Sequence, residues 1–120
     1  MPKLRNETNS AGDQRWRASN HGVTNARTYT MDAAKFADIA KAHNGVVPSG
    51  YPLAVNGEKA VPHTAEGGDP FIGHLLTDQN TAYGDIAVPV YYQGAVHADR
   101  VPLEGFTAPA AQPHSTIAYL

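Results

Sequence analysis

Cysteine is absent from the 120-residue sequence. A disulfide framework, a thiolate metal site and a cysteine nucleophile are therefore excluded. Long apolar runs are also missing, whereas a helix that crosses a bilayer needs roughly 20 consecutive apolar residues. The N-terminal region contains basic side chains but no apolar stretch of the kind found in a signal peptide. We therefore expect a soluble protein, made in the cytoplasm, with no membrane partner.

Charged residues are few, at 17% of the chain, and their signs are unevenly distributed. Residues 1–30 carry five basic and two acidic side chains, a balance of +3, whereas residues 31–120 carry four basic and nine acidic side chains, a balance of −5. A basic segment beside an acidic body indicates that the segment meets an acidic partner. The simpler alternative is a solvated polar tail whose charges only aid solubility.

Residues 1–30 lack the periodicity of a helix or a strand and contain few large apolar side chains. Such a segment cannot form a core of its own, so we predict an extended arm that becomes ordered on the surface of a partner. Arginine and aromatic residues are enriched at the centres of protein interfaces. The candidate partner-binding residues of the arm are Arg5, Arg15, Trp16, Arg17, Arg27 and Tyr29.

The triplet Arg15-Trp16-Arg17 also fits a second interpretation, since arginine contacts phosphates and tryptophan stacks on bases. The acidic body, however, would repel a polyanion. We therefore favour a protein partner and expect no nucleic acid partner. A small β-barrel adaptor that binds nucleic acid is kept as an alternative.

One short helix is predicted over about residues 31–43. Thr30 is a suitable N-cap, and Asp32 suits the positive end of the helix dipole. Phe36 and Ala40 would share the apolar face of this helix. The stripe is small, which indicates a helix that docks on a β-rich body.

After an expected helix stop at Asn44-Gly45, short runs rich in Val, Ile, Leu and Tyr alternate with Gly and Pro. This spacing is typical of a β-sandwich or a small barrel. Asn56-Gly57 lies between two apolar runs and predicts a hairpin with a type I′ turn. Gln93-Gly94 predicts a second tight turn between two strands, and Pro89 indicates a strand edge or a bulge.

These features predict a mainly β, barrel-like fold with one short helix and extended segments at both ends. We expect an arm over residues 1–30, a β-rich domain over residues 31–104, and a Pro- and Ala-rich extended tail over residues 105–120. The last residues of the tail, Ile117 to Leu120, would either form a final strand or grip a neighbouring molecule.

Motifs that carry chemistry are scarce. The six histidines, at positions 21, 43, 63, 74, 97 and 114, do not have the spacing of a metal-binding motif. His63, His74 and His97 lie on predicted β segments, which keeps a histidine-dependent metal-binding β-barrel protein or enzyme as an alternative. The motifs GxSxG and GxGxxG and the P-loop are absent. We expect no enzymatic activity, no metal and no cofactor.

Three runs between Val47 and Pro102 carry a resemblance to a known family. VPSGYPLAVNGEKAVP contains a turn followed by a short hairpin, GGDPFIGHLLTDQ contains a strand that re-enters the domain, and DIAVPVYYQGAVHADRVP contains a closing strand–turn–strand unit. In this order they resemble the lambda-type head decoration proteins of tailed bacteriophages, which cement mature capsids. The resemblance covers 56 residues, nearly half of the chain.

The resemblance implies a β-tulip fold, a homotrimer at local three-fold positions of the shell, and an N-terminal arm that orders on the capsid. It also implies the major capsid protein as partner, no small-molecule substrate, and a place on the outer surface of the virion after assembly in the host cytoplasm. The helix before the hairpin and the proline-rich tail depart from the family pattern. Our leading hypothesis is a structural protein that decorates and stabilises the capsid.

Overall fold

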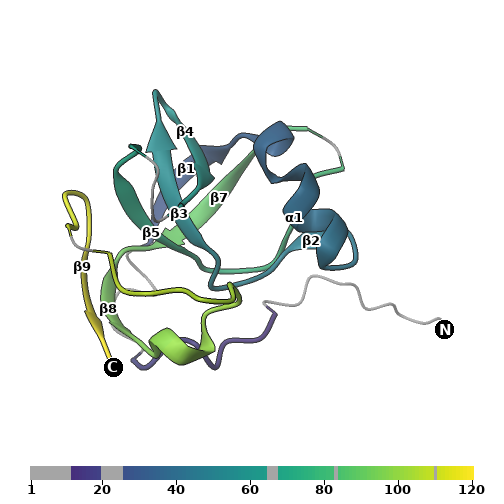
Figure 1. Ribbon diagram of the computed structural model, residues 1–120. Coiled ribbons are helices and arrows are strands. Elements are labelled where there is room, and N and C mark those ends of the chain that lie inside the picture. Colours follow the sequence, from purple (N-terminus) through teal and green to yellow (C-terminus); the bar gives the residue numbers. More distant parts are fainter. Residues whose placement is uncertain (1–11, 20–25, 65–67, 83, 110) are drawn as a thin grey trace, which may run out of the picture.

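A computed structural model describes residues 12–19, 26–64, 68–82, 84–109 and 111–120 (Figure 1). Strands predominate and there is one short helix, which confirms the predicted fold class. The strands are β1 (Arg27–Met31), β2 (Val46–Val47), β3 (Pro52–Asn56), β4 (Lys59–Pro62), β5 (Phe71–Leu75), β6 (Gln79–Asn80), β7 (Ile86–Tyr91), β8 (Gln93–Val96) and β9 (Thr116–Tyr119). The helical elements are the 3-10 turns η1 (Ala33–Phe36) and η2 (Ala98–Arg100) and the helix α1 (Ala37–Ala42).

Five strands form a ring-like sheet in the order β1-β4-β3-β5-β7 (Figure 1). Neighbouring strands run antiparallel, except that β1 and β4 are parallel. The β1–β4 and β5–β7 seams are each two residue pairs long, whereas β1 and β7 pair over five residues. The sheet is therefore barrel-like, with two short seams where its closure is weakest.

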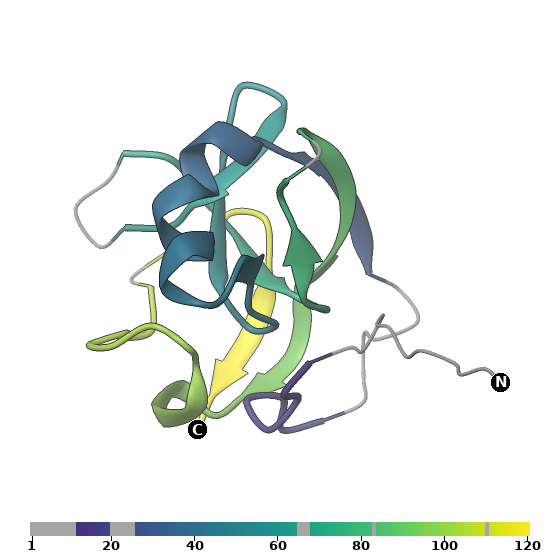
Figure 2. The ribbon, with the colours of Figure 1, turned by 90° about the vertical axis from the view of Figure 1, so that its right-hand side faces the viewer.

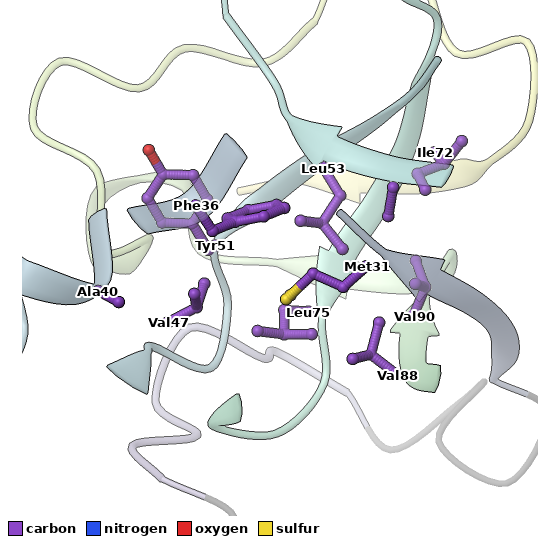
Figure 3. Packing of buried hydrophobic residues seen from close by; sticks show 11 residues of the cluster. Met31, Phe36, Ala40, Val47, Tyr51, Leu53, Ile72, Leu75, Val88 and Val90 are labelled. Atoms are coloured by element: carbon purple, nitrogen blue, oxygen red, sulfur yellow. The ribbon is translucent and has the colours of Figure 1, made fainter. Parts of the chain in front are cut away.

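Apolar side chains fill the interior of the ring (Figure 3). Strand β7 shows how the pattern arises, because Val88 and Val90 are fully buried, whereas the alternate residues Ala87 and Pro89 are exposed and half-buried. Burying a Val or Leu side chain contributes roughly 1.5–3 kcal/mol, so this cluster is the main source of stability for the ring. Its other buried members are Met31, Phe36, Ala40, Val47, Tyr51, Leu53, Ala60, Ile72 and Leu75.

The two-stranded parallel sheet of β8 and β9 lies beside the ring (Figures 1 and 2). A second buried cluster contains side chains from both of these strands. Trp16 and Tyr91 meet edge-on within it, with ring centroids 5.3 Å apart. The cluster joins residues from the described N-terminal segment to residues from β9, close to the end of the chain. Its remaining buried members are Phe71, Leu76, Val96, Val101 and Ile117.

The helix begins later than predicted. Thr30 lies in β1 and cannot cap the helix, which starts with η1 at Ala33 and continues as α1. Asp32 is the N-cap residue but forms no side-chain capping bond within the described part of the chain. Instead, the Asp85 carboxylate accepts hydrogen bonds from the Ala33 backbone N–H (2.9 Å) and from the Lys59 ammonium (2.6 Å). The helix start is thus stabilised from a loop 52 residues away.

The first predicted hairpin is confirmed as β3 and β4, but its turn is displaced by one residue. Asn56 pairs with Lys59 as a strand residue, so Gly57 and Glu58 occupy the centre of the turn. Of these residues only Gly57 has a positive φ, at 64°. Glycine at the first central position is typical of a type II′ turn, so the predicted type I′ turn is wrong.

Pro89 lies just past the end of the β5–β7 seam, in a strand with a neighbour on each side, and not at the predicted sheet edge or bulge. Strand β7 pairs with β1 from Ile86 to Val90, including Pro89 opposite Thr28. Its pairing with β5 ends at Val90 opposite Leu75. Pro89 is the next residue, so the missing backbone N–H of proline removes no bond from that ladder.

The second predicted turn, at Gln93-Gly94, is wrong. Strand β8 begins at Gln93 and pairs in parallel with β9 instead of folding back on β7. Its other edge contacts the N-terminal segment, where the Ala18 N–H donates to the Ala95 carbonyl (2.9 Å) and the His97 N–H donates to the Trp16 carbonyl (2.7 Å). Both edges of β8 are therefore occupied by segments that are remote in sequence.

The two terminal segments are more integrated than predicted. Strand β1 belongs to the ring and Trp16 is 1% exposed, so the coreless arm expected over residues 1–30 is wrong for its described part. Residues 1–11 and 20–25 lie outside the described residues. The tail over residues 105–120 contains β9, which confirms the alternative of a final strand.

Gly73 in β5 offers a test of the short β5–β7 seam. Its φ is +139°, and a Cβ atom there would lie 2.4 Å from the Tyr91 carbonyl oxygen of β7. Gly84, with a φ of +95°, is a matched control, because a Cβ atom there would have no heavy atom of the described residues within 4 Å. Strained backbone conformations cost about 1–3 kcal/mol. We expect Gly84→Ala to lower the free energy of unfolding within that range and Gly73→Ala to lower it further, measured by urea denaturation. Equal losses would contradict the inference that the close packing of Gly73 in β5 against Tyr91 in β7 contributes to stability.

Candidate functional site

Trp16, predicted to contact a partner, is part of the protein interior. Its indole N–H donates to the Ser49 hydroxyl oxygen (3.0 Å), and its ring stacks on His74 with centroids 5.6 Å apart. At 1% exposure, the ring is inaccessible to a partner protein or a base in this conformation. The nucleic-acid alternative therefore loses its stacking group, and Trp16 is instead a contact between the N-terminal segment and the body.

The neighbouring arginines have separate roles. Arg15 is exposed and forms an ion pair with Asp13, with 2.7 Å between Nη2 and Oδ2. The guanidinium of Arg15 lowers the pKa of the Asp13 carboxyl to about 2. Arg17 is half-buried and donates to the side-chain oxygen of Gln14. Arg5 lies outside the described residues.

Arg27 and Tyr29 lie in β1, away from the other predicted site residues. Arg27 is exposed, with its guanidinium carbon 3.9 Å from the centroid of the Tyr92 ring, and it donates to the His114 carbonyl (3.0 Å). Tyr29 is half-buried against the core of the ring. Arg27 lines a different surface depression from Arg15. The structure thus does not gather the described members of the predicted set into one surface.

The most buried polar side chain among the described residues is His74, in the middle of the second cluster. Its Nδ1 lies 2.8 Å from the Gly50 carbonyl oxygen, and its Nε2 lies 2.8 Å from the Tyr119 hydroxyl. A carbonyl can only accept, so Nδ1 carries the hydrogen and Nε2 accepts from the tyrosine. A residue of β5 therefore binds the loop before β3 and the C-terminal strand β9 at once. The aromatic rings packed against His74 are Trp16, Phe71, Phe106 and Tyr119.

Burial determines the protonation states of His74 and Tyr119. It lowers the pKa of His74 to about 4, while the Gly50 hydrogen bond acts in the opposite direction and nearby His63 lowers the value further. Burial also raises the pKa of the Tyr119 hydroxyl. Both groups are therefore uncharged at neutral pH. His74 has no exposed surface, and its two hydrogen bonds hold the loop before β3 and strand β9 together.

Ser49 is a second buried polar centre, which sequence analysis did not identify. Its hydroxyl accepts hydrogen bonds from the Gln14 amide (2.8 Å) and the Trp16 indole (3.0 Å), and donates to the Leu76 carbonyl (2.7 Å). Its backbone N–H donates to the Asp78 carboxylate (2.7 Å). These partners are at least 27 residues away in sequence, so no local motif could reveal them.

The three histidines considered for a metal site do not form one. His63 and His74 both approach Phe71 edge-on, but both ring nitrogens of His74 are already bonded. The Nδ1 atom of His63 is buried without a hydrogen-bond partner among the described residues, and burial lowers the pKa of this histidine. Within the described ranges, no group of three or more His, Cys, Asp or Glu side chains could hold a metal ion. The residues that suggested a metal-binding barrel therefore do not support it.

Comparisons with protein-family models, with curated proteins and with solved structures find no match to this chain. The helical elements in the described part of the chain are too short and too polar to traverse a lipid bilayer. Function must therefore be inferred from the residues and their geometry.

Burial of neutral His74 predicts that the protein loses stability in mild acid. The unfolded state takes up a proton at this residue near pH 6.5, whereas the folded state does so only near pH 4. Between these values the unfolded state binds more protons, so stability falls as the pH falls, by up to about 1.4 kcal/mol per pH unit. Urea denaturation at pH 7.0, 6.0, 5.0 and 4.5 measures this slope.

His74→Phe should flatten this profile, because it removes the titrating group. It should also lower stability at pH 7, since Gly50 and Tyr119 lose a buried partner. A smaller slope will remain, because burial lowers the pKa of His63 as well. His114→Gln, at an exposed position, is the matched control and should leave the profile unchanged. A His74→Phe profile as steep as that of the wild type would refute the assignment.

Proposed function

We propose that this protein decorates the capsid of a tailed bacteriophage: it binds the major capsid protein of the mature shell as a homotrimer and stabilises it. The observation that carries the proposal is the use of the buried polar side chains. The buried His74 and Ser49 and the half-buried Tyr119 are all bonded to remote segments of the same chain. These bonds give cohesion to a small body, which is what a structural component of a shell requires.

The course of the chain supports the same proposal in part. The β3–β4 hairpin is followed by β5, which returns antiparallel beside β3, as the resemblance to head decoration proteins implies. The expected closing hairpin is replaced by β8 paired with β9. The β3–β4 hairpin and the returning strand β5 thus fit the family pattern, whereas the pairing of β8 with β9 differs from it.

One end of the molecule is the best candidate for a capsid-facing surface. There, residues 12–19 and β9 flank β8 on its two sides (Figures 1 and 2). This end carries Leu120, which is 68% exposed, and Arg15, which is exposed and paired with Asp13. Residues 1–11, which include Lys3 and Arg5, precede this end in the chain. An apolar contact beside basic groups fits an acidic protein surface.

Deletion of residues 1–11 tests the proposal without removing any described residue. We expect the variant to keep the unfolding midpoint of the full chain but to bind empty expanded shells of the encoding phage at least about tenfold more weakly, because basic contacts are lost. Co-sedimentation with shells measures the affinity. A larger deletion of residues 1–30 is unsuitable, since it would remove Trp16 and most of β1.

Two double substitutions separate the basic segment from overall charge. Lys3→Ala with Arg5→Ala should weaken shell binding, whereas Lys35→Ala with Lys41→Ala removes the same charge from exposed helical positions and should not. Equal weakening would show that only net charge matters. If the full chain neither binds expanded shells nor raises the temperature at which they disrupt, the proposed function is wrong.

A further inference from the structure

Among the residues that the structure describes, the outer edge of β9 is covered by a side chain and not by a strand. The Gln112 amide Nε2 donates to the Ile117 carbonyl (3.0 Å), and the Ile117 N–H donates to Gln112 Oε1 (3.0 Å). The Ser115 hydroxyl donates to the same Oε1 atom (2.7 Å). In an antiparallel sheet, two opposite residues exchange both of their backbone bonds in this way. The carboxamide of Gln112 therefore takes the place of a residue on a neighbouring strand.

The hydrogen bonds of β9 show which of its backbone groups face outward. Thr116 donates to the Tyr92 carbonyl (2.8 Å) and Leu120 donates to the Val96 carbonyl (2.9 Å), both on the β8 side. Because successive residues of a strand direct their backbone groups to opposite sides, those of Ile117 and Tyr119 face away from β8. The Gln112 carboxamide bonds to Ile117, the first of these two residues.

This edge is complementary to itself. Ile117 and Tyr119 lie symmetrically on the two sides of Ala118 in the sequence. Two copies of β9, running antiparallel with Ala118 opposite Ala118, would place Ile117 of each copy opposite Tyr119 of the other. Both outward-facing residues would then form hydrogen-bonded pairs about a two-fold axis. Ala118 is small and exposed, so its side chain leaves room for the second strand.

We infer that the outer edge of β9 is a latent strand-addition surface for β9 of a second copy, and that the side-chain amide of Gln112 keeps it closed. An exposed strand edge is a template for pairing with another chain, and proteins commonly block such edges. The Gln112 contact is intramolecular, so it forms without the entropy loss of association. The inference concerns contacts between copies and does not depend on shell binding.

Gln112→Met tests the inference, because methionine keeps the length of the side chain and removes both of its bonds to Ile117. At high protein concentration, the weight-average mass from analytical ultracentrifugation should rise to twice that of the wild type and return on dilution. Gln112→Glu is a second variant, since its carboxylate accepts from the Ile117 N–H but cannot donate to the carbonyl. Its association should be intermediate, and it carries the test if the methionine variant does not fold.

Charged substitutions at Ala118 locate the contact. In the Gln112→Met background, Ala118→Lys or Ala118→Glu alone should abolish the association, because like charges would meet at the two-fold axis. An equimolar mixture of the two should restore it as a mixed pair. Ala34→Lys, at an exposed helical position, is the matched control and should have no effect.

Three results would overturn the inference. The first is a folded Gln112→Met variant with the mass of the wild type. The second is association that persists when Ala118→Lys is added, which would place the contact elsewhere. The third is a fall in the weight-average mass when Ala118→Lys is introduced into the otherwise wild-type chain. Such a fall would mean that the wild type already associates through β9, so that Gln112 does not close this edge.

Discussion

The hydrogen-bonded burial of a neutral His74 is the constraint on which the placement of both chain ends depends. Its two nitrogens need partners, because a buried polar group left without one costs about 1–3 kcal/mol. The Gly50 carbonyl and the Tyr119 hydroxyl meet that need, and the Trp16 ring covers the imidazole. A chain with β9 or Trp16 elsewhere would leave a polar ring unpaired in an apolar cluster. The cluster therefore selects one arrangement of the ends.

The ring of five strands and the sheet of β8 and β9 are stabilised by different kinds of interaction. Aliphatic side chains fill the ring of five strands, and their burial is non-directional, so it supplies stability more than specificity. The sheet of β8 and β9 is secured by directional bonds, because the Tyr119 hydroxyl of β9 donates to buried His74 and the Tyr91 hydroxyl accepts from the Ala95 N–H of β8. Because these polar groups are used in internal contacts, the side chains left for a partner are surface residues such as Leu120. The use of buried polar groups for internal contacts, with surface side chains left for a partner, favours a role in assembly.

The edges of the ring strands and of β8 are occupied by neighbouring segments. The ring leaves its five strands with a neighbour on each side, and β8 lies between β9 and the segment around Arg17. The outer edge of β9 is the place where a side chain, Gln112, substitutes for a strand. For a protein proposed to attach to a shell at this end, a closed edge would keep free copies from pairing with one another before they reach the shell.

The sequence by itself determined the features that depend on near neighbours. The β-rich class, the β3–β4 hairpin, the apolar face of the helix at Phe36 and the final strand all follow from local patterns and are present in the structure. It singled out Trp16 and His74 but could not assign their roles, because burial depends on segments far apart in the chain. The hydrogen bond from Ala33 to Asp85 at the start of the helix and the pairing of β8 with β9 were likewise decided only by tertiary structure. The physical reason is that a cap, a strand edge or a buried histidine takes whichever partner the folded chain places beside it.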